Sequence, residues 1–344
     1  MNSGARAEVA AERPVAAPVP RSVPASLHPP VDVAVKRFRV ALALGAIYLI
    51  WGTTYLAVVI MLRTIPPFAG SAMRYSFGGT LLLAWLLAFR RQAFAGLPWP
   101  RLLLAGVLLV AGGNGFAVWA QQGVPSGIAA LLISSVPVFV MVLNWLFFAR
   151  RAPDPRSLFG ILIGMCGVAV VVVHLHALAG AVRMPYVFAL LGAMLCWSSG
   201  TLVSRGTVVA SQVSAATCVQ MLVGAGLLSV IALVHGDWHA LHAARVAPAS
   251  WVALGYLTVF GSIVALSCFL WLLTQVPPHH ATTYALVNPL IALLLGSVLL
   301  GESITADVGV AVLLILVGVG LVLFQGENAL ASRLLRWPLG KPRT

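Results

Sequence analysis

Arg74 is the one basic residue that lies inside a long apolar run of this sequence. If that run crosses a bilayer, the guanidinium costs roughly 3 kcal/mol unless water or an anionic group surrounds it. Two interpretations stay open. Either Arg74 faces a polar cavity and attracts a carboxylate, or its long side chain reaches the membrane surface or fixes helix packing.

Proline interrupts two other apolar runs, as Pro137 in one and as the pair Asn288 and Pro289 in the other. Proline removes a helical hydrogen bond and leaves backbone groups that hydrocarbon cannot satisfy. Paired interruptions in the two halves of a chain are typical of binding sites near the middle of the bilayer. For a single proline, a packing kink would be the simpler explanation.

Polar and aromatic side chains inside apolar runs complete the candidate site. We predict ligand contacts for Trp51, Arg74, Asn114, Ser135, Pro137, Trp197, Tyr284, Asn288 and Pro289. We predict gate or interface positions for Trp119, Gln121, Trp271 and Glu302. Amides and hydroxyls also join membrane helices, and Trp is common at membrane surfaces, so each residue alone also fits a structural role.

The sequence offers no set of residues for catalysis or metal binding. It contains no glycine-rich phosphate loop, no His-Glu-x-x-His pattern and no clustered acids. The histidine-rich loop around His239 is better explained as a solvated segment than as a zinc site. We therefore predict no catalytic residue, no metal and no cofactor.

The elements that must position these residues are membrane helices. The chain has 344 residues, of which 60% are hydrophobic and 8% charged, and its mean hydropathy is +1.00. Apolar runs of about 20 residues match the thickness of a bilayer core. We predict an all-α polytopic membrane protein with ten transmembrane helices at 40–61, 68–89, 101–121, 125–148, 157–175, 185–204, 213–234, 249–272, 279–299 and 304–324.

The net charge of +13 comes from Lys and Arg residues that cluster between the apolar runs. This placement indicates membrane topology and argues against nucleic-acid binding. With the N-terminus in the cytoplasm, seventeen basic residues lie inside, and three lie in outer loops (Arg63, Arg183 and Arg245). We predict that both termini are cytoplasmic.

The two halves of the chain resemble each other. Three positions recur after 152 residues, namely Trp119, Pro125 and Pro137 as Trp271, Pro277 and Pro289, and two recur after 146, namely Trp51 and Gly78 as Trp197 and Gly224. Each half holds five predicted spans, and an odd number inverts the second copy. The predicted domains are a disordered cytoplasmic tail at 1–39, five-helix repeats at 40–175 and 185–324, and a cytoplasmic tail at 325–344.

Several stretches carry a family resemblance, including IYLIWGTTYLAV (47–58), GGNGFAVWAQQGVPSGIAALLISSVP (112–137) and VPPHHATTYALVNPLIALLLGSVLLGESIT (276–305). Together they resemble EamA-type transporters of the drug/metabolite transporter superfamily, and among these the YedA-like exporters. The resemblance implies two five-helix repeats and export of small metabolites or drugs from a bacterial cytoplasm. Two departures stand out. Gln121 replaces a frequent Glu, and FFARR (147–151) replaces a Gly-Glu ending that the second repeat keeps as Gly301-Glu302.

The expected function is therefore secondary transport across the bacterial inner membrane by alternating access, with amino acids or related amphiphiles as candidate substrates. Buried carboxylates usually relay protons in coupled carriers, and none lies deep in a predicted span, which favours facilitated transport or exchange. A membrane-embedded enzyme or a channel is the alternative. The expected partners are a small-molecule substrate, the lipid bilayer and a second copy of the chain, since glycines four apart, such as Gly160 and Gly164, are typical of close helix packing.

Overall fold

A computed structural model describes residues 30–124, 129, 132–149, 154–176, 184–207, 209–242, 245–291 and 306–323. These residues contain helices and turns and no β-strand. The contacts divide the chain into Met1–Arg39 and Val40–Thr344, and the packing below is that of the second unit. The position predicted at Glu302 lies outside the described residues, as do the two tails predicted at either end, apart from residues 30–39.

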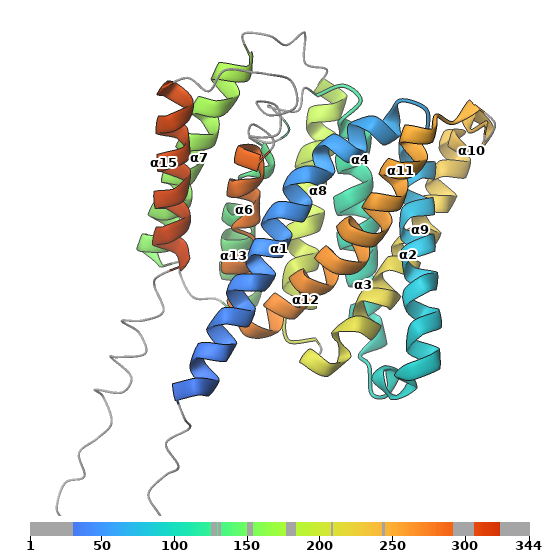
Figure 1. Ribbon diagram of the computed structural model, residues 1–344, viewed down its shortest axis with the longest axis horizontal. Helices are drawn as coiled ribbons and strands as arrows, with labels where there is room; N and C mark the ends of the chain where they lie inside the picture. The colour runs from blue at the N-terminus through green and yellow to red at the C-terminus, as the bar shows by residue number, and fades with distance from the viewer. Residues whose placement is uncertain are drawn as a thin grey trace, which may run out of the picture. The chain divides into compact units, whose positions relative to one another are not determined.

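The described residues in the first half of the chain are mainly helical (Figure 1). The helices are α1 (Pro30–Leu62), α2 (Pro67–Phe89), α3 (Trp99–Gly106), α4 (Phe116–Ala120), α6 (Val136–Leu143) and α7 (Pro155–His176). A 3₁₀ turn, η1 (Arg91–Phe94), follows α2, and π-helical segments η2 (Val107–Gly115) and η3 (Asn144–Ala149) continue α3 and α6.

The second half has a similar order of elements. The helices are α8 (Met184–Ser204), α9 (Val213–His235), α10 (Asp237–Ala240), α11 (Pro248–Tyr256), α12 (Ala265–Gln275), α13 (Pro278–Ala281) and α15 (Ala306–Leu323). The 3₁₀ turn η4 (Ala210–Gln212) precedes α9, and the π-helical η6 (Leu257–Val264) joins α11 to α12. Residues 284–291 form a further helix after α13.

Among the described residues, six helical segments are long and apolar enough to cross a membrane: Val35–Leu62, Pro67–Phe89, Trp99–Ala120, Met184–Ser204, Ala210–His235 and Pro248–Gln275. They coincide with six of the ten predicted spans. The fourth, fifth and tenth predicted spans contain the shorter apolar helices Val136–Ala149, Pro155–Gly167 and Gly309–Val322. The count of ten spans and the inverted arrangement remain predictions.

The first helix begins earlier than the predicted span. We expected residues 1–39 to be disordered, whereas α1 already starts at Pro30. Proline is favoured in the first turn of a helix, because the amide hydrogen that it lacks would have no partner there. No further proline interrupts the chain before Pro66, so the helix runs from Pro30 into the apolar segment without a break.

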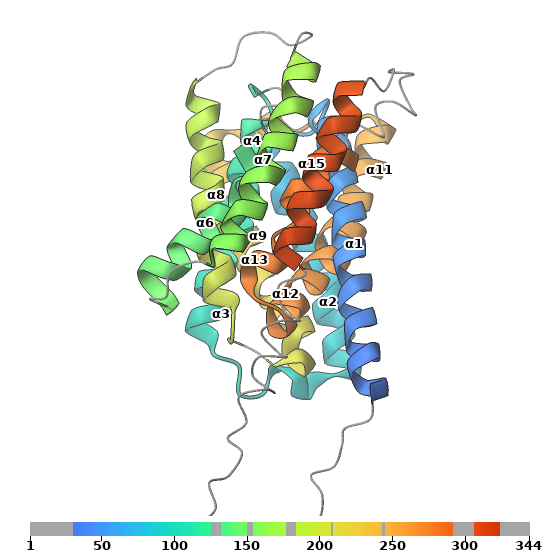
Figure 2. The same ribbon diagram turned by 90° about the vertical axis from the view of Figure 1, so that its left-hand side faces the viewer.

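Within the second unit, helices that are distant in sequence pack in pairs. Helix α2 packs along α9, and α7 packs along α15. Helices α7 and α15 lie side by side in both ribbon views (Figures 1 and 2). Glycines permit the second contact: a Cβ atom added to Gly318 would lie 2.5 Å from the carbonyl oxygen of Gly160. Small residues of this kind let membrane helices approach closely.

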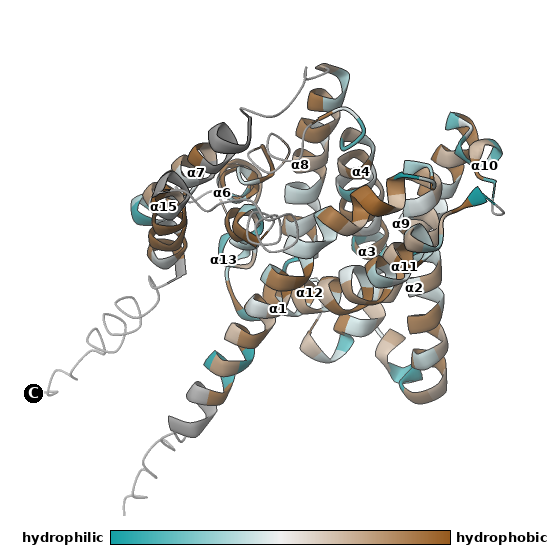
Figure 3. Ribbon diagram, turned by 45° about the horizontal axis from the view of Figure 1, so that its top comes forward, coloured by the Kyte–Doolittle hydropathy of each residue, from teal (hydrophilic) through white to brown (hydrophobic). Residues whose placement is uncertain are grey.

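The hydrophobic surface of the helices is divided between a shared core and an exposed exterior. The main cluster of buried residues includes Trp51, Phe269 and Tyr284. Other large apolar side chains are exposed, such as Leu313, Phe188 and Phe89. Hydrophobic residues lie mainly along the helices, and hydrophilic residues lie mainly at the helix ends and in the turns (Figure 3). This distribution is what a bilayer around the helices requires.

Candidate functional site

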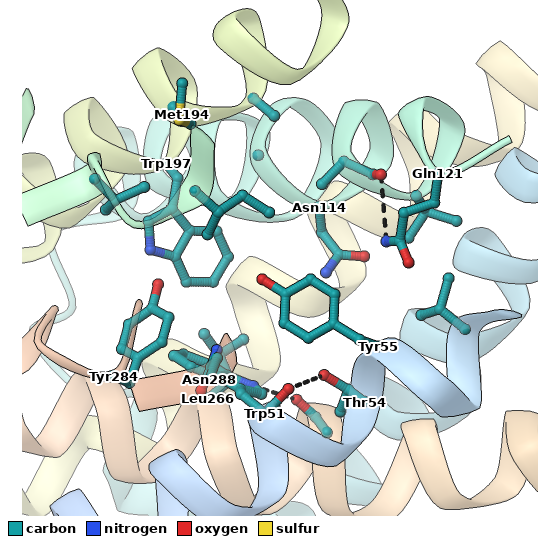
Figure 4. Close-up of a pocket in the computed structure, with 18 of the residues that line it drawn as sticks. Trp51, Thr54, Tyr55, Asn114, Gln121, Met194, Trp197, Leu266, Tyr284 and Asn288 are labelled. Atoms are coloured by element: carbon teal, nitrogen blue, oxygen red, sulfur yellow. Dashed lines mark hydrogen bonds between the residues drawn. The ribbon is translucent and has the colours of Figure 1, made fainter. Parts of the chain in front are cut away.

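A pocket with an empty volume of about 800 Å³ opens among the helices of the second unit. Its wall comes from α1, α2, η2, α4, α6, α8, η6, α12 and the helix at 284–291. The aromatic part of the wall is Trp51, Tyr55, Tyr75, Trp197 and Tyr284, and the polar part is Thr54, Arg74, Asn114, Gln121 and Asn288. Several of these side chains converge on one space (Figure 4). An apolar and aromatic wall with a few converging polar groups is the kind of lining that small-molecule sites have.

Arg74 supplies the positive charge of the pocket wall. Its side chain is 3% exposed, and its Nε donates a hydrogen bond to Ser262 Oγ at 2.7 Å. The guanidinium carbon lies 4.9 Å from the centre of the Tyr75 ring. No carboxylate of the described residues forms an ion pair with Arg74. A buried cation without a counter-ion is costly, so this arrangement favours an anionic ligand group.

An aromatic cluster forms another part of the wall. Trp51 and Trp197 meet edge to face with their ring centres 5.5 Å apart, and Tyr284 lies 4.5 Å from Trp51. Phe269 packs against all three rings. Trp51 Nε1 donates to the carbonyl oxygen of Gly261 at 3.1 Å, which fixes the orientation of that indole. The cluster therefore presents a rigid apolar surface that can stack against a ligand.

Three polar atoms of the pocket residues are buried and have no hydrogen-bond partner among the described residues. They are Asn114 Oδ1, Asn288 Oδ1 and Trp197 Nε1. The Tyr284 hydroxyl points toward the Trp197 indole (Figure 4). Buried polar groups in folded proteins nearly always find partners, so an unpartnered set in one cavity points to a ligand or to water. The set can accept hydrogen bonds from one part of a ligand and donate to another.

Two π-helical segments bring backbone and small residues to the pocket. Gly113 and Asn114 belong to η2, and Gly261 belongs to η6. A Cβ atom on Gly113 would lie 2.9 Å from the Trp197 ring, and one on Gly261 would lie 2.9 Å from Arg74 Nη2. A larger residue at either place would displace a side chain of a neighbouring helix. Such π-helical insertions are common at functional sites.

The pocket brings together seven of the residues predicted from the sequence: Trp51, Arg74, Asn114, Gln121, Trp197, Tyr284 and Asn288. Gln121 was expected at a gate, and it is half-buried in the wall, where its Nε2 donates to the Ala117 carbonyl at 3.3 Å. These residues come from five separate helices, so their convergence is a property of the tertiary structure.

Ser135, Pro137 and Pro289 do not line the pocket, although we expected ligand contacts for them. The Ser135 hydroxyl is used by the backbone, since it donates to the Leu132 carbonyl at 2.6 Å. Both prolines are buried. Their sequence neighbours Val136 and Asn288 face the pocket in their place.

The positions of the helix breaks also differ from the prediction. The first break lies at Ser134–Ser135, and α6 starts at Val136, so Pro137 lies in the first turn of a helix. The second lies at Thr282–Thr283, whereas Pro289 is inside the helix 284–291. The two threonine hydroxyls bond to the carbonyls of His279 and His280 at 3.2 and 2.7 Å, which stabilises the turn without a proline.

Trp119 and Trp271, the other gate candidates, lie outside the pocket wall. Trp119 stacks on Phe68 at 6.4 Å and lies 4.8 Å from the Tyr186 ring. Trp271 packs against the main hydrophobic cluster. Both indoles are partly buried, which is consistent with roles in helix packing.

Tyr55, Thr54 and Ser262 are site residues that sequence reasoning missed. Tyr55 and Thr54 line the pocket, and Ser262 holds Arg74. Helical spacing could have found Tyr55, because it follows Trp51 by four residues and so shares its face. No comparable signal marks Ser262, which reaches Arg74 from a span 188 residues away in the sequence.

Long apolar helices around a polar and aromatic pocket, with apolar side chains on the exterior, define this protein as a helical membrane protein. The comparisons with known proteins then give its family. The model of the EamA-like transporter family matches the chain twice, at residues 38–173 and 184–324. The chain belongs to the EamA-like transporter family.

Its relatives are described as transporters. The chain is 34% identical over 300 residues to the uncharacterized inner membrane transporter YedA of Escherichia coli K12, a match that covers 84% of this chain and 94% of that protein. It is 25% identical over 285 residues to the uncharacterized transporter YvbV of Bacillus subtilis, covering 83% and 91%.

The crystal structure of another protein aligns with this chain with a TM-score of 0.67 at 20% identity, and the alignment covers 86% of this chain and 98% of the other. That similarity establishes the fold. The family match and the relatives named as transporters identify this protein as a membrane transporter.

Proposed function

We propose that this transporter exports a small amphiphilic metabolite that carries a carboxylate, an amino acid or a close relative, from the bacterial cytoplasm across the inner membrane. The observation that carries the proposal is Arg74, a buried cation in the pocket wall without a carboxylate partner among the described residues. A substrate carboxylate would supply the missing charge through the two Nη groups.

The rest of the wall is suited to the other end of such a substrate. Asn114 and Asn288 offer unpartnered carbonyl oxygens, and an ammonium group is a donor that fits them. The rings of Trp51, Trp197 and Tyr284 provide an apolar surface for a side chain. Cationic drugs fit less well, because no Asp or Glu is among the residues that line this pocket.

Transport by this chain is facilitative or an exchange. Gln121 cannot carry a proton, and the two acids whose side chains the structure describes, Asp154 and Asp237, are absent from the pocket wall. The proposed mechanism is alternating access between two inverted five-helix repeats. It is supported by the direct contact of the repeat-matched Trp51 and Trp197, because a residue that touches its own counterpart lies near the axis that relates the copies.

The test is counterflow in proteoliposomes made with the purified protein. Vesicles are loaded with one unlabelled amino acid, and entry of the labelled compound is followed for a panel of amino acids, their decarboxylated amines and cationic drugs. We expect saturable counterflow of compounds with a carboxylate, which Arg74→Gln reduces about thirtyfold or more, since removing one partner of a buried charge pair costs about 2–5 kcal/mol. Arg74→Lys keeps the charge and should retain part of the flux.

Four results would contradict the proposal. Counterflow of amines or cations that exceeds that of every carboxylate would exclude Arg74 as the recognition group. Accumulation of substrate driven by an imposed pH gradient alone would exclude a facilitative mechanism. A non-saturable flux without counterflow would indicate a channel, and chemical conversion of the substrate would indicate an enzyme.

A further inference from the structure

One face of the second half of α2 is exposed, and it ends at a pair of arginines. Phe77, Leu81, Trp85 and Phe89 are 56%, 58%, 44% and 74% exposed. They are spaced four residues apart, so they lie on one face of the helix. The rings of Trp85 and Phe89 are neighbours, with centres 6.4 Å apart. We call these four residues the α2 stripe.

A polar hollow lies at the end of the α2 stripe. Its empty volume is about 1050 Å³, and its polar wall consists of Arg90, Arg91, Gln92, Ser211 and Gln212. Phe89 belongs both to the stripe and to the wall of the hollow. The apolar stripe and the polar hollow are therefore continuous.

Hydrogen bonds fix the wall of the hollow. Gln212 Nε2 donates to the Ala95 carbonyl at 2.9 Å, which ties η4 to the segment after η1. Arg91 Nε donates to the Leu87 carbonyl, so this guanidinium is held against the end of α2. Its remaining N–H groups and the side chain of Arg90 have no partner among the described residues.

The charge of the hollow is positive and unopposed. No acidic residue lines it. Of the two acids with described side chains, Asp237 bonds to the first turn of α2, and α2 is 23 residues long. At 1.5 Å per residue, these ends are about 34 Å apart. Asp154 begins a different helix, α7, where it bonds to Ser157.

We propose that this hollow binds the phosphate headgroup of an anionic phospholipid, with the acyl chains along the α2 stripe. Arginine matches the geometry of phosphate oxygens by paired hydrogen bonds. Basic pockets beside transmembrane helices bind anionic headgroups, most often on the cytoplasmic side, and the distribution of basic residues predicts that this end of α2 is cytoplasmic. A soluble anion would use the arginines but not the stripe. The inference is independent of the transported substrate.

The experiment measures lipid binding to the full-length protein in detergent by native mass spectrometry. The probes are phosphatidylglycerol, phosphatidylcholine with the same acyl chains, and water-soluble glycerol phosphate. We expect the double variant Arg90→Gln/Arg91→Gln to bind phosphatidylglycerol about tenfold more weakly and phosphatidylcholine unchanged. The matched control is Arg156→Gln/Arg205→Gln, which removes two other exposed arginines and should change binding less than twofold.

A second pair of variants tests the stripe. The double variant Trp85→Ala/Phe89→Ala should bind phosphatidylglycerol about threefold more weakly and bind glycerol phosphate as before. The control Phe159→Ala/Phe188→Ala, at exposed positions on α7 and α8, should change the binding of neither compound. If a variant does not fold, salt titration of the unaltered protein replaces it, because added salt should release phosphatidylglycerol selectively.

Three results would overturn the proposal. Equal binding of phosphatidylglycerol and phosphatidylcholine by the unaltered protein would exclude a headgroup site. An equal loss in both arginine double variants would indicate diffuse attraction. Saturation by glycerol phosphate at the same concentrations as phosphatidylglycerol would indicate a site for soluble anions.

Discussion

At the scale of single residues, the pocket combines groups that destabilise the empty protein. Arg74 has one neutral side-chain partner, Ser262, and Asn114 Oδ1 has none. A buried acceptor without a partner costs about 1–3 kcal/mol. Proteins retain such groups where a ligand supplies the missing partner. Removal of such a group should therefore raise the stability of the substrate-free protein and weaken substrate binding.

Asn114→Leu tests this opposition directly. The substitution keeps the approximate shape of the side chain and removes the unpartnered carbonyl. We expect the thermal unfolding midpoint of the substrate-free protein to rise, by the equivalent of about 1–3 kcal/mol, while substrate-induced stabilisation is lost. Asn144→Leu, in η3 and away from the pocket, is the control and should leave substrate-induced stabilisation intact. A variant that is less stable but still binds normally would argue against a ligand role.

Gly261→Ala tests the position of Arg74. The new methyl group would lie 2.9 Å from Arg74 Nη2 and 3.0 Å from Thr54 Cγ2, so the guanidinium must move. Overpacking costs about 1–3 kcal/mol, and we expect counterflow of carboxylate substrates to fall at least tenfold. Gly255→Ala lies in the same predicted span with no atom within 4 Å of its methyl group, and it should transport normally. Equal counterflow by the Gly261→Ala and Gly255→Ala variants would show that transport does not depend on the observed position of the Arg74 guanidinium.

At the scale of elements, the start of α2 is held by Asp237, the first residue of α10. The buried Asp237 accepts hydrogen bonds from the amides of Phe68 and Ala69 at 2.7 and 3.1 Å, and its other oxygen lies 2.6 Å from His235 Nδ1. A carboxylate at a helix N-terminus satisfies free amides and the helix dipole together. The same helix carries Arg74 two turns later.

Asp237→Ala should therefore loosen α2. The expected cost is about 1–3 kcal/mol of unfolding free energy, because two buried amides lose their acceptor. Hydrogen exchange should show faster exchange at Phe68 and Ala69. Asp154→Ala removes a comparable bond at the start of α7, 3.1 Å to the Ser157 amide, from an exposed site and should cost less. A larger effect of Asp154→Ala would contradict the role of burial.

At the scale of the whole molecule, matched helices of the two halves pack against each other. The predicted second and seventh spans are in contact as α2 and α9, and the fifth and tenth as α7 and α15. An inverted repeat requires each half to hold an odd number of spans, and two such halves place both termini on the same side.

Fusion of a fluorescent protein that folds only in the cytoplasm tests this topology. We expect fluorescence from fusions at either end of the chain, because the distribution of Lys and Arg places both ends inside. Insertion of the same protein beside Arg245, in a predicted outer loop, should be dark. Fluorescence from one terminus only would mean an odd number of spans and would exclude two complete five-helix repeats.

The amino-acid sequence by itself determined the class of protein, the positions of most helices and most of the polar and aromatic residues of the pocket wall. Hydrocarbon accepts only long apolar helices, and a charge or amide within them must have a polar neighbour, so Arg74, Asn114 and Asn288 stand out in one dimension. The tertiary structure alone decided which candidates meet. In the folded chain Asn288 faces the pocket, Pro289 packs against other residues, and Ser262 lies within hydrogen-bond distance of Arg74. These positions depend on the rotation of each helix about its axis, which π-helical segments and interhelical contacts set.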